Sequence, residues 1–101
     1  MGGVNIRTSE EQLNDFCRRW KVQELSVFGS VLRDDFRPDS DVDLLVSFAP
    51  DAQWSLYDWT DMIGELQKIF GRKVDLLSLQ GLRNPFRRHE ILKAREILYA
   101  A

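Results

Sequence analysis

The chain has 101 residues, of which 44% are hydrophobic, and this length fits one domain with a single hydrophobic core. We therefore expect residues 1–101 to form a single domain. The formal charge of −2 argues against a protein whose main function is to bind a nucleic-acid backbone through charge, so we expect no direct binding of nucleic acid.

The counts of cysteine and histidine exclude an internal disulfide and a zinc site. The chain has one cysteine, Cys17, and one histidine, which leaves no internal disulfide and no zinc-ligand spacing. The sequence has no signal peptide and no apolar run near the length that spans a bilayer. We therefore expect a cytoplasmic protein that does not contact a membrane.

The first predicted elements are a helix and a strand. The segment Thr8-Ser9-Glu10-Glu11 has the form of a capping box and predicts a helix that runs to about Trp20. Cys17 lies on the apolar face of this helix, so we expect it to be buried and to have no catalytic role. The apolar run Val22–Phe28 predicts the first strand.

A Gly-Ser step follows this strand and predicts a phosphate-binding turn. If a short helix begins near Val31, the free backbone N–H groups at its start face an anion. Arg33, one turn later, adds a guanidinium that suits phosphate oxygens. We interpret Gly29, Ser30 and Arg33 as candidate phosphate-binding residues. The lysine of a Walker A loop is absent after Gly29.

A second strand is predicted at residues 41–48, and it begins with two aspartates. Asp41 and Asp43 share one face of this strand, about 6.6 Å apart, with Leu45 and Ser47 after them. The other face is apolar and consists of Val42, Leu44, Val46 and Phe48. At an effective dielectric near 20, two such charges repel by roughly 2–3 kcal/mol, and a divalent metal is their natural counter-charge. An EF-hand is excluded because Leu44 and Pro50 replace its glycine and glutamate.

The next predicted elements are a helix over residues 54–70, closed by Gly71, and a third strand over residues 73–79. A strand that follows a helix in this way is expected to lie parallel to the strand before it, through a right-handed crossover. Alternation places Asp75 on the face opposite Val74. Asp75 either joins the acidic pair or is a charge at the edge of a strand, and the two interpretations are nearly even.

The last predicted element is a helix over residues 85–99, which begins with the N-cap Asn84 and Pro85. The basic residues at this end of the chain either balance the acidic site, meet an acidic partner or are simply solvated, and we favour solvation. These residues are Arg83, Arg87, Arg88, Lys93 and Arg95. His89 is interpreted as a surface residue rather than a proton-transfer group.

The combination of the Gly-Ser step and the acidic strand resembles the minimal nucleotidyltransferases of the DNA polymerase beta superfamily, whose signature is Gly-Ser followed further along by Asp-x-Asp. Here the signature is Gly29-Ser30 and Asp41-Val42-Asp43, and the segment KVDLL offers Asp75 as the family's third carboxylate. The resemblance covers nearly the whole chain. Asp34 departs from the glycine that commonly follows the arginine in this family.

The resemblance implies an α/β (α+β) fold, with a small mixed sheet of three or four strands and helices packed mainly on one face. It also implies an Mg²⁺-dependent nucleotidyltransferase that uses ATP. In such an enzyme, Asp41, Asp43 and Asp75 are catalytic and hold Mg²⁺, with two ions expected. Asp75 is the expected base for the acceptor hydroxyl. Gly29 and Ser30 are expected to hold the β and γ phosphates, with Arg33 beside them.

Stand-alone members resembling this chain are antitoxins paired with a HEPN-domain ribonuclease toxin. The resemblance therefore implies transfer of AMP to a tyrosine of such a toxin, in a type VII toxin–antitoxin pair, and a homo- or hetero-oligomer is compatible with that role. The alternative is a non-catalytic antitoxin that neutralises the toxin by binding alone. The intact Gly29, Ser30, Asp41 and Asp43 favour the enzyme.

Overall fold

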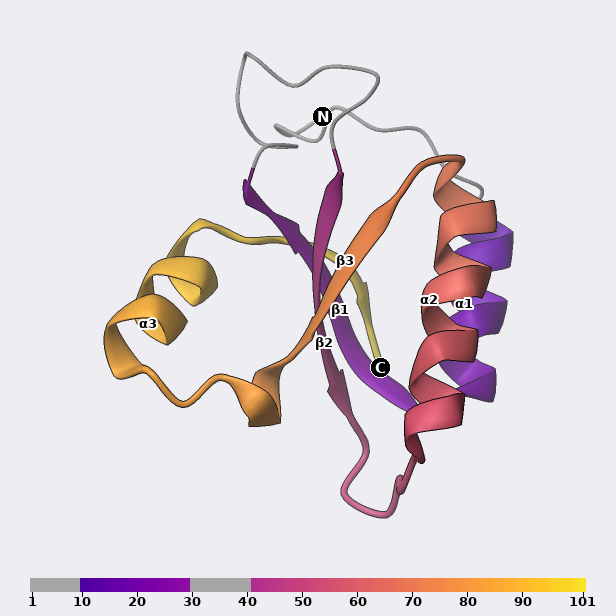
Figure 1. The fold of residues 1–101 in the computed structure, drawn as a ribbon, viewed down its shortest axis with the longest axis horizontal. Helices are drawn as coiled ribbons and strands as arrows, with labels where there is room; N and C mark the ends of the chain where they lie inside the picture. Colours follow the sequence, from indigo (N-terminus) through magenta and orange to yellow (C-terminus); the bar gives the residue numbers. More distant parts are fainter. Residues whose placement is uncertain (1–9, 30–40) are drawn as a thin grey trace.

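The computed structural model describes residues 10–29 and 41–101, and these residues form one layer of strands with helices on both sides (Figure 1). The helices are α1 (Glu10–Arg19), α2 (Leu56–Phe70) and α3 (Pro85–Ala94), with a short 3₁₀ turn, η2 (Leu79–Gly81). The strands are β1 (Val22–Phe28), β2 (Val42–Phe48), β3 (Val74–Ser78) and β4 (Glu96–Ala100). Thr8 and Ser9 of the predicted capping box lie outside the described residues.

Within the described residues the strands form a four-stranded mixed sheet in the order β3-β2-β1-β4. Strand β2 runs parallel to β3 and antiparallel to β1, and β4 adds antiparallel to the free edge of β1. The predicted parallel pairing of the second and third strands is confirmed, as is the predicted mixed sheet. None of the helices in residues 10–29 and 41–101 has the length and apolar character needed to cross a bilayer.

The main core lies between the sheet and the helices α1 and α2, which cover the same face (Figure 1). Leu44 of β2, Leu25 of β1 and Leu66 of α2 are completely buried there. Helix α3 lies on the opposite face, where Ile91 packs with Leu45 and Leu82 in a smaller cluster. Two of the three described helices share one face, as the resemblance implied.

Helix α2 begins and ends at residues whose chemistry explains its limits. Ser55 is the N-cap: its hydroxyl accepts a hydrogen bond from the backbone N–H of Asp58 at 3.2 Å. The Asp58 carboxylate in turn accepts from the Ser55 backbone N–H at 2.9 Å, which completes a capping box. Gly71 closes the helix with φ = +72°, in the left-handed region that favours glycine.

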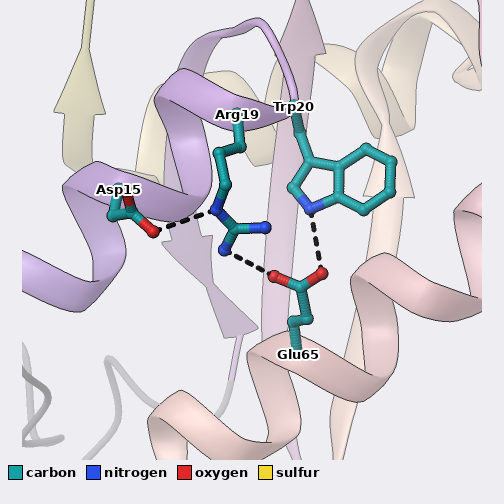
Figure 2. Close-up of polar contacts among 4 residues, drawn as sticks. All are labelled: Asp15, Arg19, Trp20 and Glu65. Atoms are coloured by element: carbon teal, nitrogen blue, oxygen red, sulfur yellow. Dashed lines mark hydrogen bonds and ion pairs between the residues drawn. The ribbon is translucent and has the colours of Figure 1, made fainter.

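Helices α1 and α2 are joined by a polar contact at their exposed side, shown in Figure 2. Glu65 of α2 accepts a hydrogen bond from Arg19 at 2.7 Å and a second from the indole N–H of Trp20 at 3.3 Å. Arg19 also pairs with Asp15 one turn earlier. Because one carboxylate receives donors from two neighbouring residues, it fixes the end of α1 against the middle of α2.

The prediction that the last helix runs to residue 99 was wrong. Helix α3 ends at Ala94, and Glu96–Ala100 form β4 instead. Arg95 leaves the helix and pairs through its Nε with Glu24 of β1 at 2.8 Å, while β4 supplies backbone partners to the edge of β1. Pairing with a strand 71 residues earlier in the chain outweighs the local helical pattern.

The Ser55 cap gives a direct test of how α2 begins. Replacing Ser55 with alanine removes the acceptor for the Asp58 N–H, so we expect the free energy of unfolding to fall by about 1 kcal/mol in urea titrations. Gln53→Ala, an exposed position two residues earlier, is the matched control and should change stability little. Equal stability of the two variants would contradict the assigned cap.

Candidate functional site

The candidate site lies where β1 ends and β2 begins. The two strands are antiparallel, and their register places Phe28, the last residue of β1, opposite Asp43 of β2. Gly29 follows Phe28 and is therefore brought to the Asp43 carboxylate by the strand pairing itself. Two parts of the predicted signature, the glycine and the second aspartate, meet in the structure as a result.

Gly29 and Asp43 are in close contact. A Cβ atom placed on Gly29 would overlap Oδ2 of Asp43, and it would lie only 3.1 Å from the Cγ of that carboxylate. Gly29 also has φ = +73°, where an L side chain is strained. Glycine is thus required at this position twice over, by the backbone conformation and by the carboxylate beside it.

Asp75 lies next to Asp43 on the neighbouring strand. The parallel register of β2 and β3 pairs Asp43 with Asp75, so both side chains project from the same face, with the strands about 4.8 Å apart. Asp75 is exposed and Asp43 is half-buried. Of the two interpretations that the sequence left open for Asp75, this register favours the one in which it joins the acidic pair.

Asp41 stands just outside β2, which begins at Val42 rather than at residue 41. The backbone N–H of Val42 donates to the carbonyl of Lys73 at 2.9 Å, so this end of β2 is fixed to the start of β3. Asp41 itself is exposed. Ser30 and Arg33, the other predicted phosphate-binding residues, lie outside the described residues.

The carboxylates have the chemistry of a hard-cation site. Mg²⁺ takes oxygen ligands, usually one or two carboxylates together with phosphates and water, and Asp43 with Asp75 supplies two carboxylates on one face. Among residues 10–29 and 41–101, no three His, Cys, Asp or Glu side chains are grouped closely enough to hold a metal ion by themselves. A cation held by Asp43 and Asp75 would take its other ligands from phosphate and water.

A second polar group on this sheet face was missed by the sequence analysis. Ser26 is fully buried, and its hydroxyl donates to Glu24 Oε2 at 3.3 Å. Arg95 donates to the same oxygen at 2.8 Å, and its other nitrogen donates to the Leu92 carbonyl. Glu24 and Ser26 alternate with Leu25 in the sequence, and that alternation was the available signal. Their role is to hold the junction between α3 and β4 against β1.

A separate groove lies away from the carboxylates. A groove of about 820 Å³ opens at the other end of β2, beside Phe48 and the start of α2. Phe48 is about 16 Å along the strand from Asp43, so the groove is separate from the carboxylates. Its aromatic walls are continuous with the ring cluster that joins the sheet to the helices, formed by Trp20, Phe48, Trp54 and Trp59.

The structure agrees with the predicted environments of Cys17 and His89. Cys17 is completely buried in the main core, and burial raises the pKa of its thiol to about 12. His89 is exposed on α3, on the far side of the sheet from Cys17. Neither residue lies in the group formed by Gly29, Asp43 and Asp75.

Known proteins are similar to this chain over most of its length. Residues 9–98 match the family described as "Nucleotidyltransferase domain". MJ1379 of Methanocaldococcus jannaschii, named provisionally as a protein adenylyltransferase, is 33% identical over 81 residues, covering 80% of this chain and 78% of that protein. The protein adenylyltransferase MntA of Thermococcus cleftensis is also 33% identical over 81 residues, covering 80% of this chain and 77% of that protein.

Solved structures share the fold. A structure named provisionally as a minimal nucleotidyltransferase matches with a TM-score of 0.70 at 34% identity, over 86% of each chain. A toxin–antitoxin structure with AMP-PNP matches with a TM-score of 0.72 at 19% identity, over 92% of this chain and 74% of that one. A structure of a tri-AMPylated HEPN toxin of Shewanella oneidensis in complex with an MNT antitoxin matches with a TM-score of 0.63 at 18% identity. The match covers 91% of this chain and 70% of that one. The last two likenesses show the fold alone.

The buried thiol gives a chemical test of the assignment of Cys17 to the core. Because its pKa is about 12, Cys17 stays protonated in the folded chain, whereas an unfolded thiol titrates near 8.5. We expect its reaction with a disulfide reagent near pH 8 to be at least about 100-fold slower than in denaturing urea. Because the pKa of this thiol is higher in the folded chain than in the unfolded chain, the free energy of unfolding should fall as pH rises above about 8.5. Fast reaction of the folded chain would contradict this burial.

A pair of glycine substitutions separates backbone strain from the contact with Asp43. Gly71→Ala introduces backbone strain without a steric clash, because φ is +72° and a Cβ there meets nothing within 4 Å. We expect it to cost about 1–2 kcal/mol of stability. Gly29→Ala has the same strain and also collides with the carboxylate, so it should cost clearly more in urea titrations.

Combining Gly29→Ala with Asp43→Ala should recover part of that extra loss, since the second change removes the colliding atoms. Strictly additive costs of the two changes would contradict the contact.

Proposed function

The chain belongs to the nucleotidyltransferase domain family, and from that premise we propose that it transfers AMP from ATP to a hydroxyl group of a partner protein. The family assignment confirms the resemblance seen in the sequence and makes the chain a nucleotidyltransferase enzyme. The proposal adds the nucleotide that is transferred, the class of acceptor and the metal.

The named activities and complexes of similar proteins support a protein as the acceptor of AMP. MntA of Thermococcus cleftensis is named a protein adenylyltransferase, and one structural neighbour is an antitoxin in complex with a HEPN toxin that carries three AMP groups. Another neighbour was solved with AMP-PNP, an analogue of ATP. We propose that this chain is likewise an antitoxin, that its acceptor is a tyrosine of a HEPN ribonuclease toxin, and that ATP is its co-substrate.

The residues of the site have distinct proposed tasks. Asp43 and Asp75 would hold Mg²⁺, and two ions are proposed. Asp41 remains a proposed metal ligand from the sequence signature. When bound, the metal would supply charge neutralisation for the triphosphate and a more acidic acceptor hydroxyl. Asp75 is the more exposed member of the pair, so its carboxylate is the one placed to take the proton of an incoming hydroxyl.

Gly29 would keep the backbone close to Asp43 and leave room for the phosphates, because even a methyl group there would fill the space next to the carboxylate. Ser30 and Arg33 remain proposed phosphate ligands from the sequence signature. The single observation that carries the proposal is the meeting of Gly29, Asp43 and Asp75, from three separate segments, at one end of the sheet.

Intact mass spectrometry tests this function directly. The proposal takes the product of the neighbouring gene to be the HEPN toxin. We expect that protein to gain AMP when it is mixed with the chain, ATP and Mg²⁺, and to stay unmodified when a chelator removes the metal. Asp43→Asn and Asp75→Asn should each lower the rate by about 100-fold or more, since each removes a carboxylate from the site.

Asp61→Asn is the matched control, because Asp61 is an equally exposed acid on α2, on the opposite face of the sheet. Its rate should equal that of the unmodified sequence. Tight complex formation without any gain of mass would contradict the proposal and favour an antitoxin that acts by binding alone.

A further inference from the structure

Helix α3 presents a surface that the rest of the described chain leaves uncovered. The first six of its ten residues, 85–90, are all exposed, and Ile91 is its only buried residue. Phe86 is 82% exposed although it is a large aromatic residue. A ten-residue helix is marginal on its own in water, so an element with so little buried surface is well suited to gain stability from a partner.

This surface is also the basic part of an acidic protein. Residues 83–95 contain five arginines and lysines and one acid, whereas the whole chain has 14 basic and 16 acidic residues. Within residues 10–29 and 41–101, the side chains of Arg83, Arg87, Arg88 and Lys93 form no ion pair. These cations are therefore available to an acidic ligand.

The position of α3 relates it to the proposed catalytic site. Ile91 packs with Leu45, which follows Asp43 by two residues and so shares its face of the sheet. Leu77, which follows Asp75 by two residues, packs against the same cluster. Helix α3 and the two carboxylates thus lie on one face, while α1 and α2 cover the other (Figure 1). A molecule bound to α3 would be on the face from which the carboxylates project.

We propose that the exposed first turn of α3, around which Phe86, Arg87 and Arg88 are spaced, docks an acidic face of the protein acceptor. This proposal rests on the proposed function and adds to it the surface that recognises the acceptor. Arginine and aromatic residues are the types most enriched where protein interfaces gain their affinity. The two arginines provide charge complementarity and Phe86 provides an apolar anchor.

A protein fits this surface better than a nucleic acid does. The chain is acidic overall, and Asp43 and Asp75 on the same face would repel a phosphodiester backbone that extends beyond α3. A folded partner can instead place its acidic residues on α3 alone and keep its hydroxyl side chain clear of them. The arginines of α3 then bind the acidic residues of the partner, and Asp43 and Asp75 stay free to hold the proposed metal.

Charge reversal tests the docking surface. The variant Arg87→Glu/Arg88→Glu is expected to fold, because both positions are exposed and acidic residues are favourable near a helix N-terminus. The matched control, Arg18→Glu/Lys68→Glu, makes the same change of charge at exposed positions on α1 and α2, on the other face. Phe86→Ala tests the apolar anchor without any change of charge.

The measurements are calorimetric binding of the product of the neighbouring gene, which the proposed function takes to be the HEPN protein, binding of ATP with Mg²⁺, and the KM and kcat of AMP transfer. We expect the α3 charge reversal to weaken partner binding and to raise KM for the partner by at least about tenfold, with kcat and ATP binding unchanged. Phe86→Ala should weaken binding as well. The control on α1 and α2 should bind like the unmodified sequence, whose affinity should fall as salt rises.

Equal partner affinity of the α3 variants and the control would overturn this proposal alone, and AMP transfer would still stand. A chain that binds ATP but not the HEPN protein would overturn both the docking surface and the choice of acceptor. Tight binding of a single-stranded RNA oligonucleotide that is lost on charge reversal would overturn the protein assignment in favour of nucleic acid.

Discussion

The register of β2 against its two neighbours is the constraint on which the rest of the structure depends. Antiparallel pairing with β1 brings Gly29 to the Asp43 carboxylate, and parallel pairing with β3 places Asp75 beside the same residue. A slip by one residue in either ladder would turn the affected carboxylate into the apolar core. The buried residues that alternate with the aspartates, Val42, Leu44 and Val46, are what fix the register, so the core determines the site.

The two faces of the sheet have different tasks. One face is covered by α1 and α2 and supplies most of the buried apolar area, with Glu65 joining the helices at their exposed side (Figure 2). The other face carries the carboxylates and only a small cluster around Leu45. Because stability comes mainly from the first face, the second can hold like charges and an exposed helix α3 at low cost to the fold.

Local patterns predicted most of this arrangement. Strand β1 was predicted with its observed limits, and Gly71 and Asn84 stand at the predicted helix ends because each has the side chain or the backbone freedom that a helix end needs. The Ser55 cap was not predicted, because the sequence pattern placed the start of this helix at residue 54. Strand β4 could not be predicted in this way, since its formation depends on the distant edge of β1 and on the pairing of Arg95 with Glu24. The position of Asp75 likewise depends on which strands are neighbours, which alternation alone does not determine.

The central claim is that Asp43 and Asp75 share a divalent cation with a bound triphosphate. Mn²⁺ takes the same oxygen ligands as Mg²⁺ and can be located by its anomalous scattering in crystals grown with AMP-PNP. The account predicts an anomalous peak within coordinating distance of both carboxylates and of a phosphate oxygen. A nucleotide whose Mn²⁺ contacts neither aspartate, or contacts Asp43 while Asp75 turns away, would contradict it.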